Sequence, residues 1–205
     1  MWPTRPHVDP SLTFDHRTAE LDSTGPIAVV LGTRPEIVKL AEVIERLGPA
    51  AEVVHTGQHF DHGLAGSFYD ELGIGRPAVD LGVHGGDRGE QLGRLVQAIS
   101  AHLAARRPRA VVVHGDTSSA LAGALAANAA DVPLAHVEAG LRSFDRRMPE
   151  EHNRVLVDHL ADLCLAPTLQ AEDHLLREGV PSTRIHVTGN TVVEAVARVR
   201  PDLHR

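Results

Sequence analysis

Cysteine is nearly absent from this chain: Cys164 is the only one among 205 residues, so no disulfide can form within the chain. It stands in the apolar run DLCLA, which favours a buried and unreactive thiol. Long apolar runs are absent as well, and residues 1–25 lack the apolar core of a signal peptide. We therefore expect a cytoplasmic protein with no membrane partner.

Aromatic residues and positive charge are also scarce. Only 3% of the residues are aromatic, which disfavours the stacking platforms that bind single-stranded nucleic acid. The formal net charge of -7 disfavours general binding to nucleic acid or to acidic membranes. No nucleic-acid partner is expected, and an anionic ligand would need a locally positive site made from helix N-termini and a few arginines.

The length and the order of the apolar segments indicate one α/β domain. Pro3, Pro6 and Pro10 among polar residues predict a disordered leader over 1–25, which leaves 26–205 for one well-buried core. Short apolar runs predict strands at 27–31, 52–56, 78–81, 110–115, 133–138, 162–166 and 184–189. Amphipathic runs predict helices at 35–47, 61–72, 87–106, 117–130, 150–161, 168–178 and 191–199. Continuous apolar strands that alternate with such helices are typical of a doubly wound parallel sheet.

Small and polar residues follow most of the predicted strands. The segments at these strand ends are GTRPE (32–36), TGQH (56–59), HGDT (114–117), EAG (138–140), PT (167–168) and GNT (189–191). In an open parallel sheet the loops at the carboxyl ends of the strands share one edge, where ligands bind. The sequence therefore predicts a ligand site at this edge.

The turn from Gly32 to Glu36 suits an anion, but it also suits an ordinary helix start. Thr33 can cap the helix and Pro35 fits its first turn, so free N–H groups and the helix dipole would attract a phosphate, with Arg34 adding charge. The alternative is a well-formed helix start with an exposed arginine, and local chemistry does not separate the two. The chain has no GxxxxGK loop, and its GxGxxA-like match at 73–78 follows a helix rather than a strand.

Several carboxylates near this edge are candidates for proton transfer. Asp116 follows a strand, two residues after His114, although it could also cap the next helix. Glu138 ends a buried strand, where a carboxylate should have a shifted pKa, as a general acid or base requires. Glu150 and Glu151 stand in the first turn of a helix, where the helix dipole favours anions, so one of the two is expected to be structural.

The 14 histidines raise the alternative of a metal site. His55, His59 and His62 cluster in the sequence, and His114 with Asp116 resembles half of a metallohydrolase motif. However, neither HxHxD nor HExxH occurs, and no cysteine supports the cluster. We expect no metal and no other cofactor. A serine nucleophile is disfavoured too, because no GxSxG elbow is present.

Six motifs, taken in order, together resemble one known family. They are GTRPE (32–36), TGQH (56–59), HGDT (114–117), HVEAGLRS (136–143), MPEEHNR (148–154) and TGNT (188–191). The chain resembles the non-hydrolysing UDP-N-acetylglucosamine 2-epimerases over about residues 26–199. This resemblance implies one Rossmann-like domain of a GT-B-like, two-domain fold.

The resemblance also implies a reaction. A base removes the C2 proton of UDP-N-acetylglucosamine, UDP leaves C1, a glycal intermediate is protonated on the opposite face, and UDP adds back to give UDP-N-acetylmannosamine. Carboxylates suit this chemistry because protons move at both faces of one carbon. The family's catalytic acids correspond to Asp116, Glu138 and Glu150 of this sequence.

The resemblance assigns binding residues as well. The positions that correspond to the nucleotide-sugar site are Arg34, Lys39, His114 and Arg142, the last of which would hold the diphosphate. Gln58 and His59 correspond to a region where bacterial members bind a second, activating substrate molecule. The partners implied are a UDP-sugar substrate and a second copy of the chain in a homodimer.

The chain departs from the family in length, because family members are about twice as long. We expect that the carboxyl-terminal domain is absent, and that turnover needs this domain from a separate chain or from a longer form of the protein. Without it, substrate positioning and water exclusion would be lost. The alternatives are a catalytically inactive relative that acts as a nucleotide-sugar binding or interaction module and, less favoured, a metal-dependent hydrolase. A smaller departure is His152, where the family has an apolar residue and where an exposed helix position would accommodate the histidine.

Overall fold

A computed structural model describes residues 25–58, 69 and 72–193 of the chain. Within them, seven parallel strands form one sheet in the order β3-β2-β1-β4-β5-β6-β7. The strands are β1 Ile27–Leu31, β2 Ala51–His55, β3 Val79–Asp80, β4 Ala110–His114, β5 Leu134–Val137, β6 Leu163–Ala166 and β7 Ile185–Val187. This confirms the predicted doubly wound parallel sheet, with β3 shorter than the run expected at 78–81.

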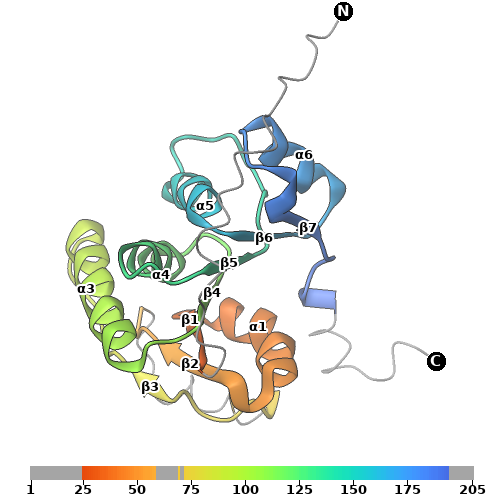
Figure 1. The fold of residues 1–205 in the computed structure, drawn as a ribbon. Helices are drawn as coiled ribbons and strands as arrows, with labels where there is room; N and C mark the ends of the chain where they lie inside the picture. Colours follow the sequence, from red (N-terminus) through yellow and green to blue (C-terminus); the bar gives the residue numbers. More distant parts are fainter. Residues whose placement is uncertain (1–24, 59–68, 70–71, 194–205) are drawn as a thin grey trace, which may run out of the picture.

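Helices lie on both faces of this sheet, as Figure 1 shows. The helices are α1 Arg34–Leu47, α3 Arg88–Arg106, α4 Ser118–Ala129, α5 Pro149–Leu160 and α6 Leu169–Arg177. Helices α3, α4 and α5 pack side by side on one face, and α1 covers the other face over β1 and β2. The helices predicted at 61–72 and 191–199 fall almost entirely outside the described residues, as does the predicted leader.

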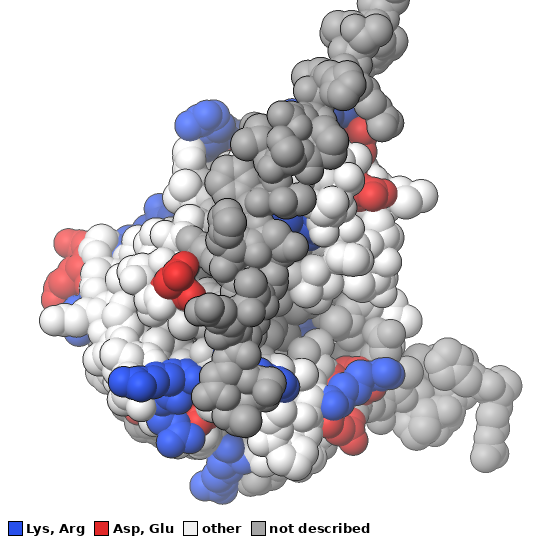
Figure 2. Space-filling view, in the orientation of Figure 1, with Lys and Arg blue, Asp and Glu red and all other residues white. Residues whose placement is uncertain are grey.

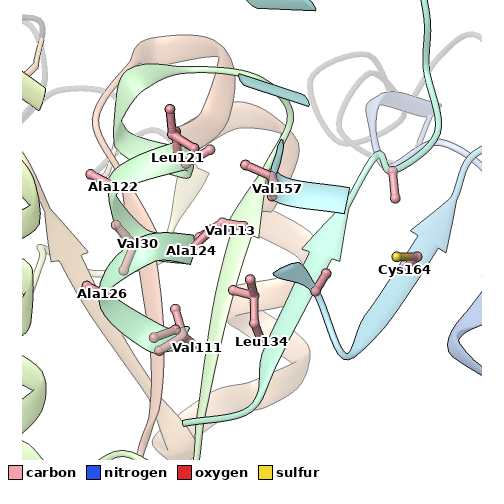
Figure 3. Close-up of a cluster of buried hydrophobic side chains, with 14 of the residues drawn as sticks. Val30, Val111, Val113, Leu121, Ala122, Ala124, Ala126, Leu134, Val157 and Cys164 are labelled. Carbon is pink, nitrogen blue, oxygen red and sulfur yellow. The ribbon is translucent and has the colours of Figure 1, made fainter. Parts of the chain in front are cut away.

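The alternation of side chains along the strands divides the core into two layers. Ala28 and Val30 of β1 face α3 and α4, whereas Val29 and Leu31 face α1. Figure 3 shows the larger layer, where valines of β1 and β4 meet the small residues of α4. Cys164 lies in the same layer, and burial raises the pKa of its thiol to about 12, which confirms the predicted unreactive thiol.

The order of the strands creates a switch point between β1 and β4. These two strands are neighbours in the sheet, but the chain leaves β1 toward β2 and leaves β4 toward β5. The chain therefore runs in opposite directions along the sheet from these two strands, and open α/β sheets bind ligands at the carboxyl edge of such a point. None of the described helices is long and apolar enough to cross a membrane.

Candidate active site

Glu138 follows β5 directly and has an unusual backbone conformation. Its φ of 70° lies in the left-handed region, which non-glycine residues rarely adopt. The N–H groups of Glu138 and Ala139 both donate to the carbonyl of Leu165, each at 3.1 Å. Strained backbone of this kind persists where the surrounding structure fixes it, and it is frequent at functional sites.

The carboxylate of Glu138 is the centre of a cluster contributed by four segments, which we call the Glu138 cluster: Lys39, His114, Glu138 and Asn190. Nζ of Lys39, from α1, donates to both carboxylate oxygens at 2.8 and 2.7 Å. Nε2 of His114, at the end of β4, lies 3.0 Å from Oε2, at ion-pair distance but outside good hydrogen-bond geometry. Nδ2 of Asn190, beyond β7, donates to Oε1 at 3.4 Å.

This environment keeps Glu138 ionised. Burial by itself would raise the pKa of Glu138, but its contacts with His114 and Lys39 outweigh burial and lower the pKa to about 2. The shift expected from the sequence is present, and its direction is downward. In this state the group is an anion whose basicity is weakened by Lys39, so a stronger base requires that Lys39 moves to another anion.

Lys39 is also the only lysine in the sequence, since all the other basic side chains among the 20 of Lys and Arg are arginines. An ammonium group is compact and can turn between partners, whereas a guanidinium prefers a fixed planar fork. Lys39 can therefore pair with Glu138 and also turn to another anion nearby.

Asp116 lies one residue after Gly115, in the turn that follows β4. Arg154 of α5 donates to its Oδ2, and Asn153 donates to its backbone carbonyl at 2.8 Å. Asp116 does not cap α4, because the neighbouring Thr117 is the N-cap and accepts from the N–H of Ala120 at 3.0 Å. The capping alternative for Asp116 is therefore wrong, and its side chain pairs instead with Arg154 after the end of β4.

Glu36 is an important buried carboxylate that the sequence reasoning did not identify. Its Oε2 accepts from the N–H groups of Gly32 at 3.0 Å and Thr33 at 2.8 Å, and its Oε1 accepts from Oγ1 of Thr117 at 2.7 Å. Burial raises the pKa of Glu36 more than these donors lower it. The capping-box spacing from Thr33 to Glu36 was the signal that could have predicted the contact.

The contacts of Glu36 correct the reading of the turn at 32–36. The N–H groups of Gly32 and Thr33 are not free to bind a phosphate, because the Glu36 carboxylate already occupies them. Arg34 is exposed at the first position of α1. The turn is therefore a helix start that ties the loop after β1 to the loop after β4.

The two glutamates at the start of α5 have different environments. Glu151 is buried, accepts from the N–H groups of Ser143 at 3.0 Å and Phe144 at 2.9 Å, and forms an ion pair with Nη1 of Arg154 at 3.1 Å. Burial raises its pKa, but these donors outweigh burial and the net shift is downward. Glu150 is exposed in the first turn. Glu151 is therefore the structural member of the pair and Glu150 is the accessible one.

The structure does not bring Arg142 to the Glu138 cluster. Its guanidinium is 1% exposed and donates to Glu178 at 2.8 and 2.5 Å and to Asp158 at 2.7 Å. Burial lowers the pKa of Arg142, but the two carboxylates outweigh it and the net shift is upward. A contact with a diphosphate would break these ion pairs, so the geometry gives the expected role no support.

Gln58 stands over the start of α4, close to the switch point. Its Oε1 accepts from the backbone N–H of Ser119 at 2.9 Å and from its Oγ at 2.7 Å. His59, the second residue of the expected activating site, lies outside the described residues, as does His62 of the metal alternative. Within the described part of the chain, no group of three or more His, Cys, Asp or Glu residues could hold a metal ion. His152 is exposed on α5, as expected.

Acidic and basic side chains are interspersed over the described part of the face in Figure 2. Positive charge for an anionic ligand therefore comes from individual residues such as Lys39. A doubly wound parallel sheet with a glutamate, a lysine and a histidine in contact at its carboxyl edge defines a Rossmann-like domain with a charged cluster where such sheets bind ligands.

Comparison with known proteins identifies the family. The chain belongs to the UDP-N-acetylglucosamine 2-epimerase family, whose sequence profile matches residues 42–205. The UDP-N-acetylglucosamine 2-epimerase of Methanococcus maripaludis is 44% identical over 170 residues, which cover 82% of this chain and 46% of that protein. The UDP-2,3-diacetamido-2,3-dideoxy-D-glucuronate 2-epimerase of Pseudomonas aeruginosa is 45% identical over 157 residues, 75% of this chain and 44% of that one.

A solved structure of this family also matches the chain over about half of its own length. The UDP-GlcNAc 2-epimerase of Methanocaldococcus jannaschii, in complex with UDP-GlcNAc and UDP, superposes with a TM-score of 0.82 at 44% identity. The match covers 84% of this chain and 49% of that chain. The chain thus spans about half the length of the relatives it matches, and its fold corresponds to one half of the two-domain enzymes. The resemblance seen in the sequence is confirmed.

Proposed function

We propose that this chain supplies the amino-terminal, proton-transferring wall of a UDP-N-acetylglucosamine 2-epimerase. The observation that supports this most directly is the Glu138 cluster at the switch-point edge, where Lys39 and His114 hold an ionised carboxylate. Relatives that are over 40% identical to this chain over the aligned residues include enzymes named for this reaction. Turnover is proposed to need the second half of the enzyme, which supplies the other wall of the cleft.

In the proposed reaction Glu138 accepts the proton from C2 of the sugar. The C–H electron pair forms a C1–C2 double bond while the bond from C1 to the diphosphate oxygen breaks, and UDP leaves with the electron pair of that C1–O bond. A second acid then protonates C2 on the opposite face, and UDP adds back to C1. Asp116 and Glu150 are the proposed partners in proton transfer. Glu150 stands in the first turn of α5, and Asp116 pairs with Arg154 of the same helix.

Lys39 links substrate binding to the basicity of Glu138. A diphosphate carries more negative charge than one carboxylate, so it competes for the ammonium group. Once Lys39 turns to the diphosphate, Glu138 loses the donor that contacts both of its oxygens and becomes a stronger base when the C2 proton is within reach. His114 stays at 3.0 Å and holds the carboxylate in place.

The nucleotide-binding part of this proposal is tested with Lys39→Met and a matched control. Arg46→Met also removes a cation from α1, but from the exposed face, where Arg46 pairs only along the helix with Glu42. UDP is titrated into the chain labelled with 15N-lysine, and we expect it to shift the single Nζ signal. The affinity of Arg46→Met for UDP should equal that of the unaltered chain. Binding to Lys39→Met should be at least about tenfold weaker, a loss of about 1.4 kcal/mol. Equal binding to the two variants would remove Lys39 from the nucleotide site.

The Pseudomonas relative gives a second candidate substrate. It is 45% identical to this chain and is named for a different UDP-sugar, so identity alone does not separate the two substrates. Parallel assays with UDP-N-acetylglucosamine and with UDP-2,3-diacetamido-2,3-dideoxy-glucuronate would decide between them. Binding of either sugar without turnover, in the presence of a second domain, would favour an inactive binding module.

A further inference from the structure

A second charged cluster lies beneath the candidate site, on the α5 side of the sheet. His136 and Asp158 are fully buried, and Nδ1 of His136 lies 2.6 Å from Oδ1 of Asp158. Nε2 of the same ring lies 2.8 Å from the carbonyl oxygen of Gly115. Asp158 also pairs with the buried Arg142 at 2.7 Å. None of these residues belongs to the Glu138 cluster.

The two partners of His136 define the protons on its ring. A carbonyl oxygen can only accept, so Nε2 carries a proton toward Gly115. Asp158 accepts from Nη1 of Arg142 and from the N–H of Gly140, and both donors favour its ionised form. An ionised carboxylate also only accepts, so Nδ1 carries a proton as well. Either neutral tautomer would instead place a ring lone pair against an acceptor, at 2.6 Å from Asp158 or at 2.8 Å from the carbonyl of Gly115.

The charges in this cluster balance only with a charged ring. Arg142 contributes one positive charge, and Asp158 and Glu178 contribute two negative charges. An imidazolium at His136 completes two cations and two anions and places a positive charge against the fully buried Asp158, whereas Glu178 is 28% exposed to solvent. Two other titratable groups lie against this cluster and add little to its net charge. The Cys164 thiol is neutral, and His159 is half exposed and 3.8 Å from Glu178.

The cluster contacts both turns that carry the candidate catalytic carboxylates. His136 binds the carbonyl of Gly115, the residue before Asp116. Asp158 accepts from the N–H of Gly140, two residues after Glu138, at 3.2 Å. Gly115, Glu138 and Gly140 have positive φ angles of 64°, 70° and 81°. Turns in this conformation need fixed partners to hold one geometry.

We propose that His136 is a buried imidazolium which, together with Asp158, clamps the two strand-end turns that carry Asp116 and Glu138. This makes His136 and Asp158 positioning residues, because they act through the backbone and do not touch the reacting atoms. Their importance for turnover rests on the proposed function, whereas the charge of the ring and the clamp are properties of the folded chain. We call this pair the His136–Asp158 clamp.

The charge is tested without any substitution, by 15N NMR of the histidine-labelled chain. We expect both ring nitrogens of His136 to be protonated at pH ~7.5, where an unperturbed imidazole is mostly neutral. One protonated and one unprotonated nitrogen would overturn the proposal. Assignment follows from the signal that disappears in His136→Gln, and the measurement needs no UDP-sugar, so its result is independent of the proposed function.

The clamp is tested with two matched histidine variants. His102 offers the control, since its Nε2 lies 2.7 Å from the buried Glu52, which also pairs with Arg106, far from the candidate site. Both His136→Asn and His102→Asn should lower stability, but only the first should shift the amide signals of Gly115 and Gly140 and speed their hydrogen exchange. The amide of His136→Gln can still donate to Gly115. This variant should therefore shift the two amide signals less than His136→Asn does. Unchanged Gly115 and Gly140 signals in folded His136→Asn would refute the clamp.

Discussion

At the scale of single residues, the surroundings give chemically identical carboxylates different roles. Glu138 is held ionised by Lys39 and His114, Glu151 orders the loop at 143–144, and Glu36 joins two turns. The sequence predicted that Glu138 is a candidate base and that one of Glu150 and Glu151 is structural. It could not say which one, because that depends on which side of α5 faces the loop at 143–144.

The ion pairs of Glu138 predict a specific dependence of stability on pH. Its pKa is about 2 in the folded chain, below the reference value of 4.5, so its contribution is fully present above pH 4.5 and is lost as pH falls toward 2. We expect the free energy of unfolding to fall between pH 7 and pH 3 by roughly 1–2 kcal/mol more in the unaltered chain than in Glu138→Gln. Urea unfolding at the two pH values measures this difference. An identical fall in both proteins would mean that Glu138 has an ordinary pKa.

Glu36 should be more important for stability than Glu42, which is half-buried on α1. Glu36→Ala leaves the N–H groups of Gly32 and Thr33 and the hydroxyl of Thr117 without their acceptor, so we expect a loss of about 3 kcal/mol. Glu42→Ala removes a surface ion pair with Arg46 and should cost less than about 1 kcal/mol. Denaturant unfolding of Glu36→Ala, Glu42→Ala and the unaltered chain measures these losses in the free energy of unfolding. Equal, small losses would show that other groups can satisfy these donors.

At the scale of helices and strands, periodicity alone predicted most of the fold. Continuous apolar runs became the central strands β1 and β4, and the helices α1, α3, α4, α5 and α6 begin and end within two residues of the expected bounds. The run at 78–81 became the two-residue strand β3, because only Val79 and Asp80 pair with β2. The contact of Glu36 with Thr117 and those of the His136–Asp158 clamp could not be predicted, since they join residues distant in sequence.

The crossing of β1, β2 and α4 depends on the absence of a side chain at Gly32. A Cβ atom there would lie 2.1 Å from Oγ1 of Thr56 and 2.2 Å from Oγ of Ser119. We expect Gly32→Ala to lower the free energy of unfolding by about 2 kcal/mol or more.

Gly93→Ala is the matched control within helix α3, where a Cβ meets nothing within 4 Å. This substitution should raise stability by about 0.5–1 kcal/mol, because alanine loses less backbone entropy in a helix than glycine. Thermal unfolding of the two variants tests the contrast. A harmless Gly32→Ala would mean that the hydrogen bond between Thr56 and Ser119, 2.7 Å long, can rearrange without cost.

At the scale of the whole molecule, the described residues form one continuous sheet with a core on both faces and a candidate site at one edge. They correspond to one half of the related enzymes, which bind their ligand with both halves present. The proposed chemistry is therefore divided: this half holds the proton-transfer groups, and the other half completes the cleft and excludes water.

The most direct test of the central claim is deuterium exchange at C2. The chain is incubated with UDP-N-acetylglucosamine in deuterated water together with the carboxyl-terminal half of the Methanocaldococcus jannaschii enzyme, and the sugar is followed by proton NMR. We predict deuterium at C2 and the manno epimer with the unaltered chain, and neither with Glu138→Gln. Equal exchange with both chains, or no exchange with either, would contradict the account.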